Sequence, residues 1–251
     1  MLLLAAQSGL GQSSEVRELL QKVAATYRGI QDYQVQIRRV RTGSKHPIQT
    51  DHIADSDLHF DPSRSLAFNF DVPRPVMVMA RSGQRFYFQS GDASWKVPSF
   101  WLTDGVTTWH YVHRLNKYTE EQARPWPEHP AKSQGPPSIE WKYLGRFRVV
   151  DSMIDKAKLM KENVGASADC PEVTAIVDLQ LSADANEQLH IMTRSGLVCQ
   201  AVVRSRRDAG PHVIYQTDTT TWSYRSVTGD VEQKLFVFVP PKHAKRVKSL
   251  R

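Results

Sequence analysis

The hydrophobic period of the chain changes from helical to extended twice, and this limits the folds that it can adopt. Residues 13–30 carry apolar side chains at the spacing of an amphipathic helix, and beyond Tyr33 apolar and polar side chains alternate. A second helical stretch over 143–163 is followed by further alternating segments. The predicted order is therefore helix, strands, helix, strands. It lacks the regular strand–helix alternation of a parallel nucleotide-binding sheet.

Short alternating segments separated by glycine-containing turns are typical of an antiparallel meander. We therefore predict an α+β fold: a large curved antiparallel sheet, forming an incomplete β-barrel, with the helices packed across its concave face. Such a half-barrel leaves an apolar cleft between sheet and helices. The expected strands cover residues 33–37, 66–70, 84–89, 106–112, 173–181, 189–191, 197–204, 213–225 and 235–239.

Composition and charge exclude several classes of protein. The 251 residues include 33 Lys+Arg and 26 Asp+Glu, a formal charge of +7, and the basic residues form short clusters with no nucleic-acid-binding motif. We therefore predict a mildly basic surface that binds no nucleic acid and can make peripheral contact with an anionic membrane. No stretch approaches the roughly 20 apolar residues of a membrane-spanning helix.

The N-terminal residues resemble the end of a secretory signal peptide. Residues 2–6 are apolar, and Gly9-Leu10-Gly11 has the small-x-small pattern of a cleavage site. We read 1–12 as a signal peptide remnant; the alternative is a frayed end of a cytosolic protein. Residues 13–251 are then one domain, with a Pro-rich inter-helix loop over 122–138.

The two cysteines, Cys170 and Cys199, are predicted to be free and mostly buried. The strand assignment places them two strands apart, which at about 4.8 Å per strand gives about 10 Å, beyond disulfide reach. A disulfide would require a different register, and export would make it chemically permissible.

Motifs of catalysis and metal binding give no positive signal. The chain has no His-Glu-x-x-His, Gly-x-Ser-x-Gly, Cys-x-x-Cys or phosphate-binding glycine loop. His110 and His113 are three apart on a predicted strand and point to opposite faces. His52 and His59 lie in an aspartate-rich stretch that reads more simply as a solvated loop. We predict no catalytic residues, no metal and no cofactor.

Four motifs, taken in order, carry a family resemblance. They are Tyr27-Arg28-Gly29-Ile30-Gln31-Asp32-Tyr33 after the first helix, Thr103-Asp104-Gly105-Val106-Thr107-Thr108-Trp109-His110-Tyr111, Thr193-Arg194-Ser195-Gly196-Leu197-Val198, and Phe236-Val237-Phe238-Val239-Pro240-Pro241-Lys242-His243-Ala244. Together they resemble the LolA-like superfamily of bacterial envelope proteins, which includes the lipoprotein carrier LolA and RseB-like stress sensors.

The resemblance implies an incomplete β-barrel closed by helices, a periplasmic location and binding of lipid or acyl groups without catalysis. We therefore expect a monomeric, exported protein that holds a lipid, a lipoprotein acyl chain or another hydrophobic ligand between sheet and helices. The alternatives are an envelope interaction or sensor module with a filled core, RseB-like or fused ahead of a thioredoxin-type domain, and a hydrolase. The candidate cavity residues are Phe68, Phe86, Phe88, Trp109, Tyr111, Ile191 and Trp222.

Overall fold

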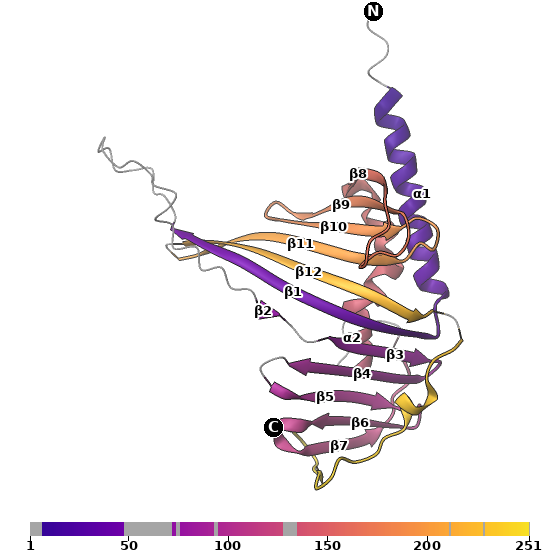
Figure 1. Ribbon diagram of the computed structural model, residues 1–251, viewed down its shortest axis with the longest axis vertical. Helices are drawn as coiled ribbons and strands as arrows, with labels where there is room; N and C mark the ends of the chain where they lie inside the picture. The colour runs from indigo at the N-terminus through magenta and orange to yellow at the C-terminus, as the bar shows by residue number, and fades with distance from the viewer. Residues whose placement is uncertain are drawn as a thin grey trace, which may run out of the picture.

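A computed structural model describes residues 7–47, 72–73, 76–92, 95–127, 135–210, 212–227 and 229–250 (Figure 1). Within these residues thirteen strands form a single sheet. No helix in this part of the chain is both long and apolar enough to cross a membrane. The predicted strand over 66–70, including Phe68, and the histidines His52 and His59 lie outside the described residues.

The sheet is built from two meanders joined by one long strand. Strand β1 lies in the middle, pairing with β3 on one side and with β12 on the other, and the strand order is β13-β7-β6-β5-β4-β3-β1-β12-β11-β10-β9-β8, with β2 also on β1. All pairings are antiparallel except that of β13 with β7. The strands are β1 (Tyr33–Pro47), β2 (Val72–Pro73), β3 (Met77–Ser82), β4 (Arg85–Asp92), β5 (Trp95–Thr103), β6 (Thr107–Val112), β7 (Lys117–Gln122), β8 (Ala157–Val164), β9 (Thr174–Ser182), β10 (Ala185–Met192), β11 (Val198–Ala209), β12 (His212–Ser226) and β13 (Lys245–Arg246).

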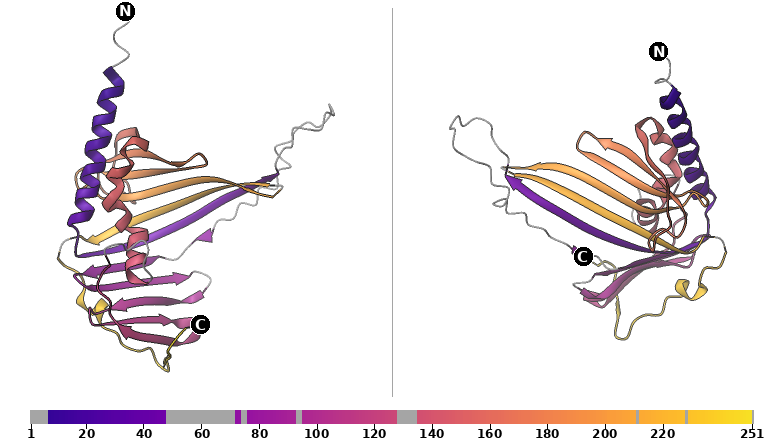
Figure 2. Two further views of the ribbon diagram at one scale, coloured as in Figure 1. Left: turned by 180° about the vertical axis from the view of Figure 1, so that it is seen from behind. Right: turned by 45° about the horizontal axis from the view of Figure 1, so that its top comes forward.

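The helices α1 (Gln7–Gly29), α2 (Pro136–Tyr143) and η4 (Gly145–Lys156) cover one face of the sheet, here called the inner face (Figure 2). Short 3-10 turns η2 (His113–Leu115) and η5 (Gln233–Phe236) lie in connections. On α1, Val16, Leu20 and Val23 recur at helical spacing and are at most 2% exposed. The predicted α+β class, with a large curved antiparallel sheet, is confirmed.

The space between α1, η4 and the sheet is filled by side chains. Tyr27 of α1 and Phe147 of η4 pack with ring centroids 4.9 Å apart, and Phe147 meets Trp222 of β12 edge-on at 5.5 Å. Leu20 and Trp222 are at most 1% exposed. The half of the inner face that belongs to β1 and β8–β12 is therefore a packed core.

The second helix differs from the prediction. Helix α2 begins at Pro136, earlier than expected, and is separated by Leu144, with φ −129°, from the 3-10 helix η4. A Cβ on Gly145 would lie 2.9 Å from the Trp141 ring, so the glycine permits this close turn. The helical structure ends at Lys156, and the residues that follow form strand β8 at the edge of the sheet.

Two chain segments near the termini also differ from the prediction. Helix α1 begins at Gln7, six residues before the predicted start at residue 13. The predicted last strand over 235–239 is wrong: η5 and irregular chain occupy this region. Phe236 is buried against Ala80, while Phe238 packs with Trp109 of β6, and these contacts with an existing sheet face replace strand pairing.

The prediction of free thiols is wrong, because Cys170 and Cys199 form a disulfide with Cα atoms 5.3 Å apart. The reason is that Cys170 precedes β9, which begins only at Thr174. The loop containing Cys170 is held against the β10–β11 turn, where Thr193 N donates to Val173 O at 3.0 Å. This loop brings Cys170 to the start of β11, so strand spacing does not limit the approach.

Candidate functional site

The candidate residues predicted from the sequence divide between two faces of the sheet. Phe86, Phe88, Ile191 and Trp222 lie on the inner face, in one core cluster, and each is at most 7% exposed. Ile191 and Trp222 belong to its filled half. Phe86 and Phe88 lie on β4, beside the hollow described below.

Trp109 and Tyr111 lie on the outer face, so the prediction that they line a space between sheet and helices is corrected. The β5–β6 register pairs Leu102 with Trp109 and Trp101 with His110, which places Trp101 and Trp109 on opposite faces. Trp109 stacks on Phe238, with ring centroids 5.1 Å apart, so the C-terminal segment covers it.

A hollow of about 510 Å³ lies between β5, β6 and β7 on one side and the described parts of the Pro-rich segment, residues 123–127 and 135, on the other. We call it the aromatic pocket, because Trp101 of β5 and Trp126 of the Pro-rich segment both line it. The wall is completed by Pro125, Pro127 and Gly135 of that segment and by the first two residues of α2, Pro136 and Pro137. Its polar lining side chains are Gln84, Thr103, Thr108, Glu121, Gln122 and Arg124.

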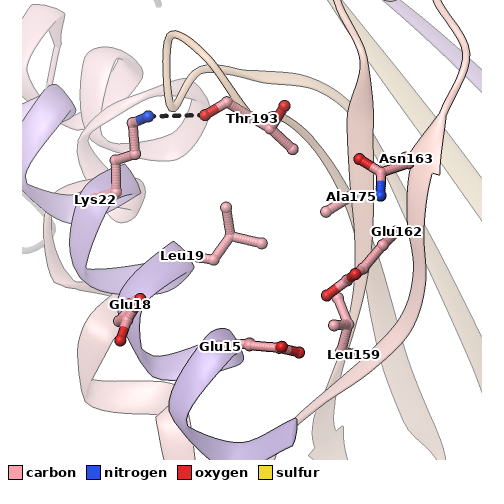
Figure 3. A pocket seen from close by; sticks show the side chains of 9 residues that line it. All are labelled: Glu15, Glu18, Leu19, Lys22, Leu159, Glu162, Asn163, Ala175 and Thr193. Atoms are coloured by element: carbon pink, nitrogen blue, oxygen red, sulfur yellow. Dashed lines mark hydrogen bonds between the residues drawn. The ribbon is translucent and has the colours of Figure 1, made fainter. Parts of the chain in front are cut away.

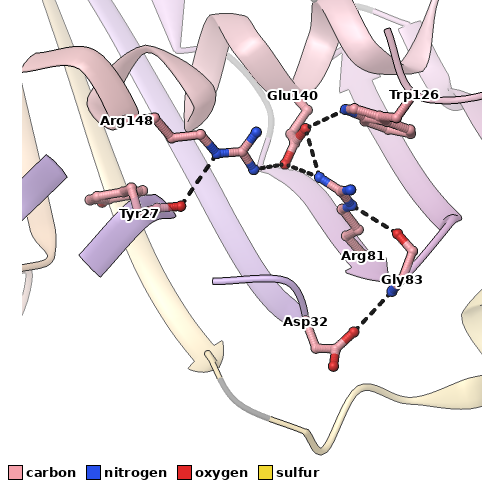
Figure 4. Close-up of polar contacts among 7 residues, drawn as sticks. All are labelled: Tyr27, Asp32, Arg81, Gly83, Trp126, Glu140 and Arg148. Carbon is pink, nitrogen blue, oxygen red and sulfur yellow. Dashed lines mark hydrogen bonds and ion pairs between the residues drawn. The ribbon is translucent and has the colours of Figure 1, made fainter. Parts of the chain in front are cut away.

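Trp126 is positioned by a buried carboxylate (Figure 4). Its Nε1 donates to Glu140 Oε2 at 3.1 Å, and its ring lies 5.6 Å from that of Phe86. The guanidinium of Arg81 lies over the indole, 4.4 Å from the ring centroid. Phe86, a residue predicted from the sequence, therefore packs against the Trp126 ring and does not itself line the pocket. The position of this wall depends on Trp126 and Glu140 as well.

Glu140 of α2 is fully buried and joins three further elements. Arg81 Nη1 of β3 donates to its Oε1 at 3.0 Å and to its Oε2 at 3.2 Å, and Arg148 Nη2 of η4 donates to Oε1 at 2.8 Å. Arg148 Nε also donates to the Tyr27 carbonyl of α1 at 3.3 Å. A buried charge needs such partners, and here they fix α2 and Trp126 relative to the sheet.

Trp101 stands beside a neutral imidazole. The rings of Trp101 and His110 stack with centroids 3.8 Å apart and planes 11° apart. Burial lowers the pKa of His110 to about 4, so the imidazole is uncharged at neutral pH. This side of the pocket is therefore an uncharged aromatic surface.

A second hollow, of about 300 Å³, opens between α1 and β8 (Figure 3). We call it the seam pocket. Leu19, Leu159 and Ala175 form its apolar part, and Lys22 Nζ closes one end by donating to the Thr193 carbonyl at 2.7 Å. The carboxylates of Glu15, Glu18 and Glu162 lie along its rim.

Across the seam pocket, Glu15 of α1 and Glu162 of β8 oppose each other (Figure 3). The negative charge of Glu162 raises the pKa of Glu15 above its ordinary value. An acidic rim is a poor site for an anionic or apolar ligand. Among the described residues, no group of three or more His, Cys, Asp or Glu side chains is placed to hold a metal ion.

Comparison with known proteins gives a likeness of fold at low identity. No family model and no curated protein matches the chain. It is similar to LprF from Mycobacterium bovis, with 10% identity, a TM-score of 0.39 and coverage of 86% of this chain and 97% of LprF. For the Mycobacterium tuberculosis lipoprotein LppX the values are 10%, 0.41, 86% and 99%. For an uncharacterized conserved protein from Thermus thermophilus they are 12%, 0.38, 93% and 98%.

The architecture itself, a large unclosed antiparallel sheet with helices along one face, agrees with the fold class that the order of helical and alternating segments predicted.

Sequence reasoning did not select Trp101, Trp126 or Glu140 as site residues. A usable signal was a tryptophan flanked by prolines in the predicted loop, Pro125-Trp126-Pro127, because a large aromatic side chain in a Pro-rich loop needs a surface to cover it. Glu140 gave no signal, because one glutamate in a helix usually faces solvent.

Proposed function

We propose that this chain is a non-enzymatic binding protein that holds the apolar part of a small hydrophobic ligand, such as a lipid or acyl chain, in the aromatic pocket. One observation carries the proposal: Trp101 and Trp126 line a hollow of about 510 Å³ at the junction of sheet, Pro-rich segment and α2. Ligand pockets commonly measure about 300–1,000 Å³ and combine aromatic walls with a few polar groups.

The energetics of such a site follow from the area that it removes from water. Each buried methylene contributes about 0.8 kcal/mol, so six would contribute about 5 kcal/mol before the cost of association. His110, which stacks on Trp101, is uncharged at neutral pH. A ligand that covers Trp101 therefore does not have to desolvate a charge on this ring pair, which supports binding of an apolar group there. Trp126 is held by Glu140 and Arg81, so less ordering entropy is lost on binding.

Export to the cell envelope is part of the proposal. The disulfide between Cys170 and Cys199 supports it, because structural disulfides persist in oxidising compartments and are rare in the cytosol. The periplasm is the location that the resemblance implies. Catalysis is left out of the proposal, because the titratable groups that line the pocket, Glu121 and Arg124, are exposed, whereas catalytic acids and bases are commonly tuned by burial.

The alternative of an envelope interaction or sensor module is favoured by a different observation. The core between α1, η4 and the half of the sheet formed by β1 and β8–β12 is filled, with Phe147 and Trp222 in edge contact. If the aromatic pocket took up no ligand, the remaining features would be those of a folded scaffold with a packed interior.

The test uses a neutral apolar dye, N-phenyl-1-naphthylamine, whose fluorescence rises on burial, titrated into protein purified without detergent. We expect saturable binding that Trp101→Ala weakens by about tenfold or more, since a buried aromatic contributes roughly 1.5–3 kcal/mol. Trp109→Ala is the matched control. It removes a half-buried tryptophan from the neighbouring strand on the opposite face and should change affinity less than about twofold.

Circular dichroism establishes that both variants are folded. A folded Trp101→Ala protein that binds the dye as tightly as the unmodified chain would contradict the assignment of the pocket. Absence of saturable binding by the unmodified chain would favour the interaction module.

A further inference from the structure

A third hollow, of about 390 Å³, shares the lining residue Gln84 with the aromatic pocket. We call it the arginine pocket, because Arg28, Arg81 and Arg148 line it. The other polar side chains on its wall are the amides of Gln31 and Gln84. No carboxylate is among its lining residues in the described part of the chain. Three guanidinium groups and two amides supply the kind of hydrogen-bond donors that an anionic group needs.

Carboxylates beside the wall offset the positive charge of this pocket, but none of them is among its lining residues in the described part of the chain. Arg81 and Arg148 both donate to the one carboxylate of Glu140, which leaves one excess positive charge in that cluster. Arg28 is paired with Asp151 at 2.6 Å, but its side chain is 53% exposed. Asp32 lies near the pocket and accepts a hydrogen bond from the Gly83 amide at 3.0 Å (Figure 4).

The arginine pocket and the aromatic pocket are in contact with each other. Gln84 lines both of them. Arg81, in the wall of the arginine pocket, lies 4.4 Å above the indole of Trp126, in the wall of the aromatic pocket. A single elongated molecule lying across this shared wall at Gln84 would meet aromatic rings at one end and guanidinium groups at the other.

We propose that the ligand is an anionic amphiphile. Its apolar part lies in the aromatic pocket, and its acidic group, a carboxylate, sulfate or phosphate, binds between Arg28, Arg81 and Arg148. This inference rests on the proposed function and specifies the class of ligand. The buried Glu140 then has two roles: it holds Trp126 in one pocket, and it orients two of the three arginines that form the other.

The experiment compares two ligands of equal chain length, decanoate and decan-1-ol, as competitors that displace N-phenyl-1-naphthylamine at pH 8. We expect decanoate to bind at least about tenfold more tightly than decanol, because charge-assisted hydrogen bonds to guanidinium groups exist only for the acid. The preference should fall as salt is added, since salt screens partly exposed charges.

Two variants assign this preference to the pocket. Arg28→Gln should weaken decanoate binding about threefold and leave decanol binding unchanged. Arg38→Gln is the matched control: Arg38 is also exposed and also paired with an aspartate, Asp169, but does not line the pocket. Arg148→Gln should weaken decanoate binding about tenfold, with circular dichroism as the check on folding.

The outcomes separate this inference from the proposed function. If decanol and decanoate displace the dye equally well, the anion site is wrong while the hydrophobic site stands. If Arg28→Gln and Arg148→Gln, both folded, keep the full preference for decanoate, the acidic group binds elsewhere and the inference is overturned. If the dye itself does not bind, the proposed function fails and this inference with it.

Discussion

Glu140 is the residue on which both pockets depend, and its charge is balanced entirely by side chains. Its carboxylate accepts from Arg81, Arg148 and Trp126, and it is 0% exposed. In the Glu140→Gln protein the two guanidinium groups would lose the partner that compensates their positive charge. Removing one member of a buried ion pair typically costs about 3–5 kcal/mol.

We therefore predict that Glu140→Gln lowers the free energy of unfolding by about 3 kcal/mol or more, measured by urea denaturation. The control is Asp151→Asn, which breaks the more exposed pair with Arg28 and should cost less than about 1 kcal/mol. Equal losses in the two variants would mean that Glu140 has no special role in stability.

At the residue scale, the sequence predicted apolar character but not the face of the sheet on which a side chain lies. Alternation along β6 shows that Trp109 and His110 point opposite ways, yet nothing in the pattern says which of them faces the helices. Both faces of this half of the sheet are covered, one by the Pro-rich segment and one by the C-terminal segment around Phe238. Both faces therefore carry aromatic residues, and hydrophobicity alone could not choose between them.

At the scale of elements, helix α1 and strand β8 each place a negatively charged side chain at the seam between them. Glu15 and Glu162 oppose each other across the seam pocket, and the charge of Glu162 raises the pKa of Glu15. The folded protein therefore binds a proton at Glu15 more tightly than the unfolded chain does. The contribution of Glu15 to the free energy of unfolding is therefore fully present below the ordinary pKa of glutamate. It is lost as pH rises through the raised pKa of the folded protein.

We predict that Glu15→Gln raises the melting temperature at pH 7, where the repulsion between the carboxylates is present, and that the gain disappears as pH is lowered below the ordinary pKa of glutamate. Glu18→Gln, on the same helix and the same pocket rim, is the control for removing one negative charge. A gain that is independent of pH, or equal in both variants, would rule out the Glu15–Glu162 repulsion as its cause.

The elements themselves were predicted unevenly, for reasons that lie in tertiary contacts. The buried face of helix α1 was predicted, because Val16, Leu20 and Val23 face one continuous core, whereas its start at Gln7 was not. The second helix was extended too far, because Ala157 has helical spacing to the preceding apolar residues but is the first residue of the edge strand β8. The disulfide was missed because the loop before β9 places Cys170 where strand spacing alone could not.

For the molecule as a whole, the order of helical and alternating segments was enough to predict a curved antiparallel sheet with helices on one face. The location of the hollow was not predictable in the same way. It depends on which half of the inner face is filled: η4 places Phe147 against Trp222 in one half, whereas in the other half the wall opposite Trp101 is the Pro-rich segment. Such packing arises from contacts between segments distant in the chain.

Because one half of the inner face is filled and the other holds the aromatic pocket, the two halves should respond differently to a bound ligand. A ligand that binds only the folded state raises the free energy of unfolding by about 2.7 kcal/mol at a hundred times its dissociation constant. If decanoate occupies the aromatic pocket, the global melting temperature should rise, and added protection from hydrogen exchange should appear in β5, β6 and α2. The other half of the molecule, which comprises α1 and strands β8–β12, should gain protection from hydrogen exchange only through this global stabilisation. Added protection concentrated in α1 and β8 would instead place the ligand in the seam pocket, because those elements form its walls.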